Sequence, residues 1–179
     1  MLPIILIILA AILLVATIIL IVVINAKRNE RIKYNIAAGN TLREEYLNHS
    51  LRNDVYSESN HKPGSIKLMI YLKTKYGKQK IRYVFNPENR ILIGRDKYES
   101  NIYVNDKTVS KKHCCIYLSG GQVYLEDMNA ANGTVVERGL FKNYKIVANN
   151  RIILRSRDRV IVGSSIIKVI LFYYDMSTM

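Results

Sequence analysis

Cysteine is scarce in this chain of 179 residues, and the two that it has, Cys114 and Cys115, are adjacent. Neighbouring side chains on a strand point to opposite faces, so these thiols are not expected to pair with each other. We expect one to pack in the core and the other to lie near the surface. The pair lacks the spacing of a zinc site and suits a reducing cytoplasm, so we predict no metal site and no cofactor.

Acidic residues are also few, with 14 Asp and Glu against 27 Lys and Arg, for a formal net charge of +13. Residues 65–179 hold most of this excess, with 20 basic residues against 9 acidic ones, whereas residues 27–64 hold 7 against 5. A basic domain suits a phosphorylated, acidic partner, and it is also attracted to an anionic membrane. Charge alone does not choose between these two readings.

One long apolar run stands at the N-terminus, where Pro3 and Thr17 are the only interruptions between Leu2 and Ile24. As a helix, such a run of about 23 residues measures roughly 34 Å, which is enough to cross a bilayer. A cleaved signal peptide is the alternative, but the basic n-region and the small residues of a cleavage site are missing. We therefore predict a transmembrane anchor over residues 1–26.

The charges around this run predict its orientation. No Lys or Arg precedes it, and four basic residues follow at once, namely Lys27, Arg28, Arg31 and Lys33. By the positive-inside rule, the N-terminus lies outside and all that follows lies in the cytoplasm. The expected localisation is the cell membrane, with a single pass.

Residues 27–64 are expected to form a partly helical juxtamembrane linker. Apolar residues recur at spacings of about four, and Thr41 followed by Glu44 resembles a capping box at the start of a helix. A short amphipathic helix and a mostly solvated stalk both fit this pattern. Residues 57–64 are rich in turn formers and predict a flexible connection.

From residue 65 onward the pattern is all-β. Short runs rich in Ile, Val and Tyr are broken by turn residues every 8 to 12 positions or so, which is typical of a sandwich or barrel. We predict one domain over residues 65–179, and eleven strands, at 66–71, 80–85, 90–94, 102–104, 113–118, 122–127, 134–136, 145–147, 151–154, 159–162 and 166–173.

Three loops of this domain carry groups that suit a bound phosphate. Arg95 follows a strand that ends in Gly94, and a guanidinium can grip two phosphate oxygens at once. Ser110 offers a hydroxyl and a backbone N–H, and Lys111 adds a positive charge. Asn132 has a side-chain amide that can donate to and accept from a peptide backbone. In a simple meander the loops of Ser110 and Asn132 share one end, but the loop of Arg95 lies at the other.

These residues resemble a known family, the forkhead-associated (FHA) domain. The resemblance rests on residues 92–95, on residues 110–113, and on Asp127-Met128 leading to residues 132–134, and it extends over roughly residues 65–174. It implies an FHA-type β-sandwich of about eleven strands that binds phosphothreonine peptides. It also implies that the fold brings the three loops together at one end.

The resemblance assigns roles within these loops. It implies that Arg95 and Ser110 contact the phosphate, that Lys111 assists, and that Asn132 binds the peptide backbone. Structural support of the site is expected from Gly94, His113 and Gly133. The chain departs from the family at Ala130 and Ala131, where Ser and a polar residue, frequently Thr, are common. One lost hydrogen bond to a charged group, roughly 1.5 to 3 kcal/mol, weakens phosphate binding tenfold or more without abolishing it.

The expected function is therefore that of a membrane-anchored adaptor on the cytoplasmic face, which recruits a phosphothreonine-bearing protein such as a Ser/Thr kinase or its substrate. The alternative is a phosphate-independent FHA scaffold in a cell-envelope assembly for wall synthesis, division or secretion. We predict no catalytic residues, because no evident third group orients His113 toward Ser110 as in a hydrolase.

A second basic feature lies outside these motifs. Five cations and three tyrosines alternate over residues 71–83, where a hairpin is expected. This hairpin suits a membrane surface better than nucleic acid if the domain is tethered to a bilayer, and we expect no nucleic acid partner. A solvated strand face is the ordinary explanation of the same pattern.

Overall fold

The computed structural model describes residues 2–51, 66–139, 142–146 and 149–178. They fall into two compact units, Met1–Ala37 and Ala38–Met179. The second unit contains the end of a long helix and all the strands. The predicted connection over residues 57–64 lies outside the described residues.

Helix α1 (Leu2–Leu51) runs without a break for 50 residues. We expected a partly helical linker after the apolar run, and its described part, residues 27–51, is helical and continuous with that run. Residues 27–51 contain no proline and only Gly39 among the helix breakers, so the helix continues through them. Thr41 and Glu44 lie inside α1, and they do not form a cap at its start.

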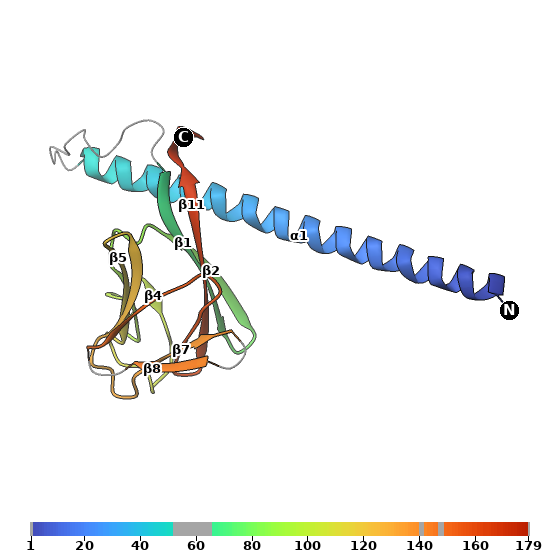
Figure 1. The fold of residues 1–179 in the computed structure, drawn as a ribbon. Helices are drawn as coiled ribbons and strands as arrows, with labels where there is room; N and C mark the ends of the chain where they lie inside the picture. The colour runs from blue at the N-terminus through green and yellow to red at the C-terminus, as the bar shows by residue number, and fades with distance from the viewer. Residues whose placement is uncertain (1, 52–65, 140–141, 147–148, 179) are drawn as a thin grey trace. The chain divides into compact units, whose positions relative to one another are not determined.

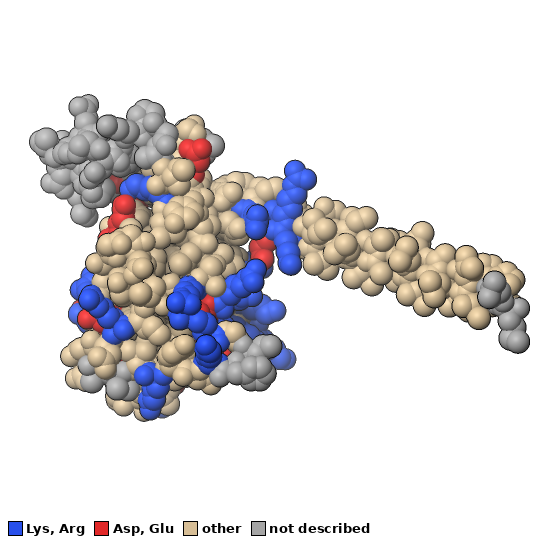
Figure 2. All heavy atoms as spheres, in the orientation of Figure 1, with Lys and Arg blue, Asp and Glu red and all other residues tan. Residues whose placement is uncertain are grey.

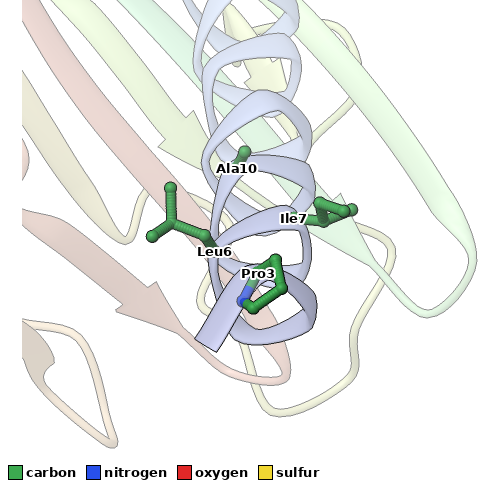
Figure 3. A pocket seen from close by; sticks show the side chains of 4 residues that line it. All are labelled: Pro3, Leu6, Ile7 and Ala10. Carbon is green, nitrogen blue, oxygen red and sulfur yellow. The ribbon is translucent and has the colours of Figure 1, made fainter. Parts of the chain in front are cut away.

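The first unit contains the apolar run of α1 and the more polar residues that follow it, up to Ala37. Its large aliphatic side chains are exposed, and an 18-residue window of α1 reaches a mean hydropathy of 3.6. By length and composition this helix is a candidate membrane span. The hydroxyl of Thr17 donates to the Leu14 carbonyl at 2.8 Å, so the polar group within the apolar run is satisfied. A hollow near the N-terminal end is lined by Pro3, Leu6, Ile7 and Ala10 (Figure 3), whose side chains carry no hydrogen-bonding group for a polar ligand.

The second unit is a β-sandwich of eleven strands in two sheets (Figure 1). The six-stranded sheet has the order β2-β1-β11-β10-β7-β8, and its strands are β1 (Ile66–Tyr76), β2 (Gln79–Phe85), β7 (Thr134–Arg138), β8 (Lys142–Ile146), β10 (Arg159–Val162) and β11 (Ser165–Asp175). The five-stranded sheet has the order β4-β3-β5-β6-β9, with β3 (Ile91–Gly94), β4 (Ile102–Tyr103), β5 (Cys114–Ser119), β6 (Gln122–Asp127) and β9 (Arg151–Ile153). A short 3₁₀ helix follows at Met176–Thr178.

These strands confirm the expected architecture. Each predicted strand overlaps an observed one, and β6 and β10 have the predicted bounds. The least accurate prediction is at 145–147, because β8 begins at Lys142 and ends at Ile146. Four of its five residues are exposed, so this strand lacks the apolar alternation that reveals the others.

The core lies between the two sheets and is made of alternate residues on each strand. Ile70 and Leu72 of β1 face Ile93 and Ile116 of the other sheet within one buried cluster. Cys114 belongs to this core and is fully buried. Cys115 points to the other face of β5 and is only 3% exposed, so the expectation that it lies near the surface is corrected. Burial raises the pKa of both thiols, and both are free.

The last turns of α1 pack on the outer face of the six-stranded sheet. Ala38 and Leu42 are buried in a cluster with Met69 of β1 and Tyr174 of β11. The Glu45 carboxylate accepts hydrogen bonds from the side-chain amides of Asn86 and Asn89, at 3.1 and 3.0 Å. This end of the helix is therefore part of the sandwich unit.

Candidate functional site

Three loops meet at one end of the five-stranded sheet because of the way its strands pair. Ile93, near the end of β3, pairs with Cys114 at the start of β5, and Cys114 pairs with Asp127 at the end of β6. Strand β4 runs parallel to β3, so it ends at the same side. Loops 95–101, 105–113 and 128–133 therefore come together. The count that placed Arg95 at the opposite end is wrong, because it assumed that β4 is antiparallel to β3.

Arg95 is the first residue after β3, and two hydrogen bonds hold it against the second loop. Its backbone N–H donates to the Ser110 carbonyl at 3.0 Å, and its Nε donates to the Val109 carbonyl at 3.0 Å. The residue is exposed, so its guanidinium is oriented by the protein and still open to solvent. This arrangement suits an anion, because the bond at Nε fixes the plane of the charged group.

Gly94 is required by the close approach of the same two loops. A Cβ atom at this position would lie 1.9 Å from the backbone oxygen of Lys111. That oxygen accepts a hydrogen bond from the Asp96 N–H at 3.3 Å. Gly94 thus supports the site by letting the first two loops touch.

Ser110 lies between the second and third loops. Its Oγ accepts a hydrogen bond from the Ala131 N–H at 3.3 Å, so its own hydroxyl hydrogen can be donated to an anion. Lys111 follows directly and is exposed. Its neighbour Lys112 forms an ion pair with Glu99 at 2.7 Å, and the hydrogen bond to Glu99 raises the pKa of Lys112. Lys112 therefore ties the first loop to the second.

His113 is fully buried and joins the second loop to the third. Its Nδ1 accepts a hydrogen bond from the Ser110 N–H at 3.2 Å, so the ring hydrogen lies on Nε2, which donates to the Gly133 carbonyl at 3.1 Å. Burial lowers the pKa of His113, which favours this neutral form. The histidine positions backbone and takes no part in proton transfer in this arrangement.

Asn132 reaches across to the second loop. Its Nδ2 donates to the Thr108 carbonyl at 2.7 Å, and the residue is exposed. Gly133 follows with φ at 68°, a left-handed conformation that glycine adopts without strain. The turn presents the Asn132 side chain at the surface where the second and third loops meet.

Two aspartates hold these loops in place, and sequence reasoning gave neither of them a role. The buried Asp127 accepts from the Ala130 N–H at 2.9 Å and from the Thr134 hydroxyl at 2.7 Å, which closes the third loop. Asp106 accepts from the N–H groups of Thr108 and Ser164, both at 2.9 Å. The signal was available locally, because Asp side chains often bond backbone N–H groups two or three residues ahead.

Asp106 also joins the second loop to the turn between β10 and β11. Hydrogen bonds from the hydroxyls of Ser164 and Thr108 lower its pKa well below the usual range. Gly163 belongs to the same contact, since a Cβ there would lie 2.6 Å from Val109 and 2.7 Å from Asp106. Among the residues that the structure describes, no group of three or more His, Cys, Asp or Glu could hold a metal ion.

The family model of the FHA domain matches residues 91–163, a range that contains all three loops. The chain contains an FHA domain. The matched part runs from β3 to the turn after β10, and the structure adds β1, β2 and β11 to the same sandwich. FHA domains are interaction modules, and the resemblance inferred from the sequence is confirmed.

Several solved FHA structures are similar to the chain, and no curated protein matches it. The FHA domain of the CT664 protein from Chlamydia trachomatis is 19% identical, with 57% of this chain and 96% of that one covered and a TM-score of 0.49. EmbR from Mycobacterium tuberculosis, in complex with a low-affinity phosphopeptide, is 18% identical, with 57% and 24% covered and a TM-score of 0.47. The FhaA FHA domain, complexed with the intracellular domain of Rv3910, is 26% identical, with 56% and 98% covered and a TM-score of 0.45.

Proposed function

We propose that the three loops bind a phosphothreonine peptide, with Arg95 and Ser110 on the phosphate, Lys111 beside it and Asn132 on the peptide backbone. The observation that carries this proposal is the Arg95 guanidinium, which a bond from Nε to the Val109 carbonyl holds next to Ser110. FHA domains generally bind phosphothreonine peptides, and this chain has such a domain.

The chemistry of the first two loops suits a phosphoryl dianion. With Nε on the Val109 carbonyl, the terminal nitrogens of Arg95 would face the ligand and give two charge-assisted hydrogen bonds. The Ser110 hydroxyl would add a third, because the Ala131 N–H already occupies its oxygen as a donor. Lys111 would contribute charge without fixed geometry.

Asn132 would read the peptide chain. Its Nδ2 lies on the Thr108 carbonyl, which aims the amide group before a ligand arrives. Its Oδ1 would then accept an N–H from an extended peptide, so the threonine is held by both its phosphate and its backbone. Gly94, His113 and Gly133 would act only by positioning these loops.

We further propose that α1 anchors this FHA domain at the cell membrane, with the N-terminus outside and the domain in the cytoplasm. The support is the apolar candidate span and the four basic residues that follow Ile24. The protein would then be an adaptor that brings a Ser/Thr kinase, or a protein phosphorylated by one, to the membrane. A reporter fused to the N-terminus and active only in the cytoplasm should stay inactive, and activity would contradict this topology.

Ala131 favours one rival function, a phosphate-independent scaffold in a cell-envelope assembly. It stands where many FHA domains have a hydroxyl that helps to bind phosphate. In this chain the Ala131 N–H donates a hydrogen bond to Ser110 Oγ. The rival predicts equal binding of phosphorylated and unmodified partners.

The two functions are separated by a peptide library experiment with the full chain in lipid nanodiscs. Matched phosphothreonine, phosphoserine and unmodified libraries are compared for retention, with Arg95→Ala beside the parent. Lys142→Ala is the control, since it also removes one cation but lies on β8 opposite Arg138, at the far end of β7 from the loops. We expect phosphothreonine preference in the parent and the control, and its loss in Arg95→Ala. Equal retention of all three libraries by the parent would support the scaffold.

A further inference from the structure

Four cations stand in one line across the outer face of the six-stranded sheet. Lys73 of β1 lies directly opposite Arg82 of β2 and directly opposite Lys168 of β11. Lys168 in turn lies opposite Arg159 of β10. The sequence showed only the part of this row within the β1–β2 hairpin, because Lys168 and Arg159 are brought in by strand pairing nearly a hundred residues later.

Like charges face each other along this row, and Lys73 also has contacts outside it, among them a cation–π contact in which its Nζ lies 5.6 Å from the centre of the Tyr71 ring. Side chains directly opposite each other on neighbouring strands have Cβ atoms about 5 Å apart, and like charges at such positions are destabilising. Glu137 of β7 pairs with Arg159 at 3.1 Å and relieves one end of the row. In the described strands, the residues opposite Arg82, Lys73 and Lys168 within the row are themselves cations. A second cationic pair, Lys75 and Lys80, faces across β1 and β2 two residues further on.

The rest of this outer face has a different character. Ala38 and Leu42 of α1 cover it around Met69 and Tyr174, so the cations occupy the part toward the β1–β2 turn. Figure 2 shows Lys and Arg side chains gathered over this hairpin. Near the turn two apolar side chains are exposed among them, Tyr76 at 43% and Ile81 at 47%.

We propose that this face, which we call the cationic face and define by Lys73, Lys75, Lys80, Arg82 and Lys168, binds the headgroups of an anionic phospholipid bilayer. The cationic face lies on three neighbouring strands, β2, β1 and β11, spaced by about 4.8 Å, and a surface several strands wide matches a membrane better than a single extended peptide. Tyr76 is a residue type enriched at the membrane interface, and Ile81 is apolar enough to enter it. Ala38 and Leu42, the helix residues on the same face, belong to the same helix as the apolar run.

The strength of this interaction follows from the number of charges. Each Lys or Arg close to an anionic membrane surface contributes roughly a fivefold preference for that surface. The preference is electrostatic, so it must decline as salt screens the charges. This inference is independent of phosphothreonine binding, which the three loops would perform whether or not the cationic face contacts lipid.

A single tryptophan gives a direct test, because the chain has none of its own. The Tyr76→Trp protein, as the full chain in nanodiscs, is quenched with brominated phosphatidylcholine, in discs with or without phosphatidylglycerol. We expect strong quenching only in the discs that contain phosphatidylglycerol, and its loss in high salt. Equal quenching in both kinds of disc would overturn the proposal. So would a fluorescence change produced by polyglutamate or RNA but not by phosphatidylglycerol, since the partner would then be an acidic protein or a nucleic acid.

Matched variants show whether the row itself is responsible. Arg82→Gln with Lys168→Gln removes two charges from the cationic face. We expect the part of the quenching that is lost in high salt to fall more than tenfold in this variant. Arg90→Gln with Arg151→Gln removes two charges from the five-stranded sheet and should leave quenching unchanged. The same response in both variants would contradict the assignment.

A second measurement does not depend on lipid. Arg82→Glu with Lys168→Glu places Lys73 between two carboxylates, so like-charge neighbours become opposite-charge pairs across β2, β1 and β11. We expect this variant to lose the quenching while its midpoint of thermal unfolding stays equal to that of the parent or rises. A lower midpoint would show that the cations are needed for the fold, and would overturn the idea that they are kept for a ligand.

Discussion

The loop end and the cationic face are both positively charged, but they organise charge differently. At the loop end, cations are held in place by other groups, as Arg95 is by the Val109 carbonyl and Lys112 by Glu99. On the cationic face, Lys73 lies between two other cations on neighbouring strands, with its Nζ 5.6 Å from the centre of the Tyr71 ring. A cation of fixed orientation recognises one small anion, whereas cations spread over several strands suit an extended negative surface. The same net charge therefore supports two different kinds of binding.

The strongest way to break the loop end is to separate its first two loops. Gly94→Ala would place a Cβ atom 1.9 Å from the Lys111 carbonyl oxygen, so one of the loops must move. We expect a loss of more than about 3 kcal/mol in the free energy of unfolding, together with loss of phosphopeptide binding. Denaturation of the full chain and peptide titration measure the two effects.

Gly77→Ala provides the control for that experiment. Gly77 has a positive φ, 56°, and a Cβ there meets nothing within 4 Å. Only the backbone strain remains, which costs about 1 kcal/mol, and the loops are untouched. An equal loss of stability in the two variants would mean that the contact between Gly94 and Lys111 does not hold the loops together.

The loop end can also be strengthened. Ala131→Thr adds a hydroxyl at an exposed position next to Ser110, where a bound phosphate is expected. A hydrogen bond to a charged group is worth roughly 1.5 to 3 kcal/mol, so phosphothreonine affinity should rise tenfold or more while affinity for the unmodified peptide stays the same. Isothermal titration with both peptides is the measurement. An unchanged affinity for the phosphorylated peptide would place the phosphate elsewhere.

The loop end should respond to acid because of His113. Burial lowers the pKa of His113 in the folded protein, so the unfolded chain binds its proton first as the pH falls. The contribution of neutral His113 to the free energy of unfolding is fully present above the unfolded pKa of about 6.5. It is lost as the pH falls below that value toward the folded pKa. We expect the melting temperature of the parent to decline through this window, with a smaller slope in His113→Gln. Parallel slopes in the two proteins would exclude His113 as the cause.

The smallest expected effect is the change in stability that salt causes through the cationic face. On the cationic face added salt screens repulsion between Lys73 and its neighbours, so it should stabilise the parent by a few tenths of a kcal/mol. In Arg82→Glu with Lys168→Glu, salt screens attraction and should destabilise by a similar amount. Thermal melts at low and high salt measure both. A shift of the same sign in the two proteins would show that cross-strand charges do not control this face.

Much of the sandwich could be predicted from local sequence. Alternating apolar residues locate nearly every strand, because one side of each must face the core, as Val160 and Val162 of β10 do. The exposed strand β8 carries little of this signal, and its predicted position was displaced. The motifs of the three loops were also readable, because their order and separations along the chain resemble those of the FHA family, although no single motif is specific by itself.

The relations between distant segments could not be read in this way. Whether β4 runs parallel to β3 depends on how residues 95–101 turn, and this decides where Arg95 lies. The row formed by Lys73, Lys168 and Arg159 likewise depends on strand order, which no local pattern gives. The continuity of α1 was not predicted for another reason, because the apolar spacing after residue 26 indicated a helix but did not show that it joins the apolar run.

The central claim is that a positioned Arg95 reads a phosphate on threonine, and the affinity ratio between a phosphothreonine peptide and its unmodified form tests it most directly. The ratio is measured with one peptide selected by the parent, for the full chain, Arg95→Ala and the Lys142→Ala control. We expect a large ratio in the parent and the control, and a ratio near one in Arg95→Ala. A parent ratio near one, or a ratio that survives in Arg95→Ala, would contradict the claim.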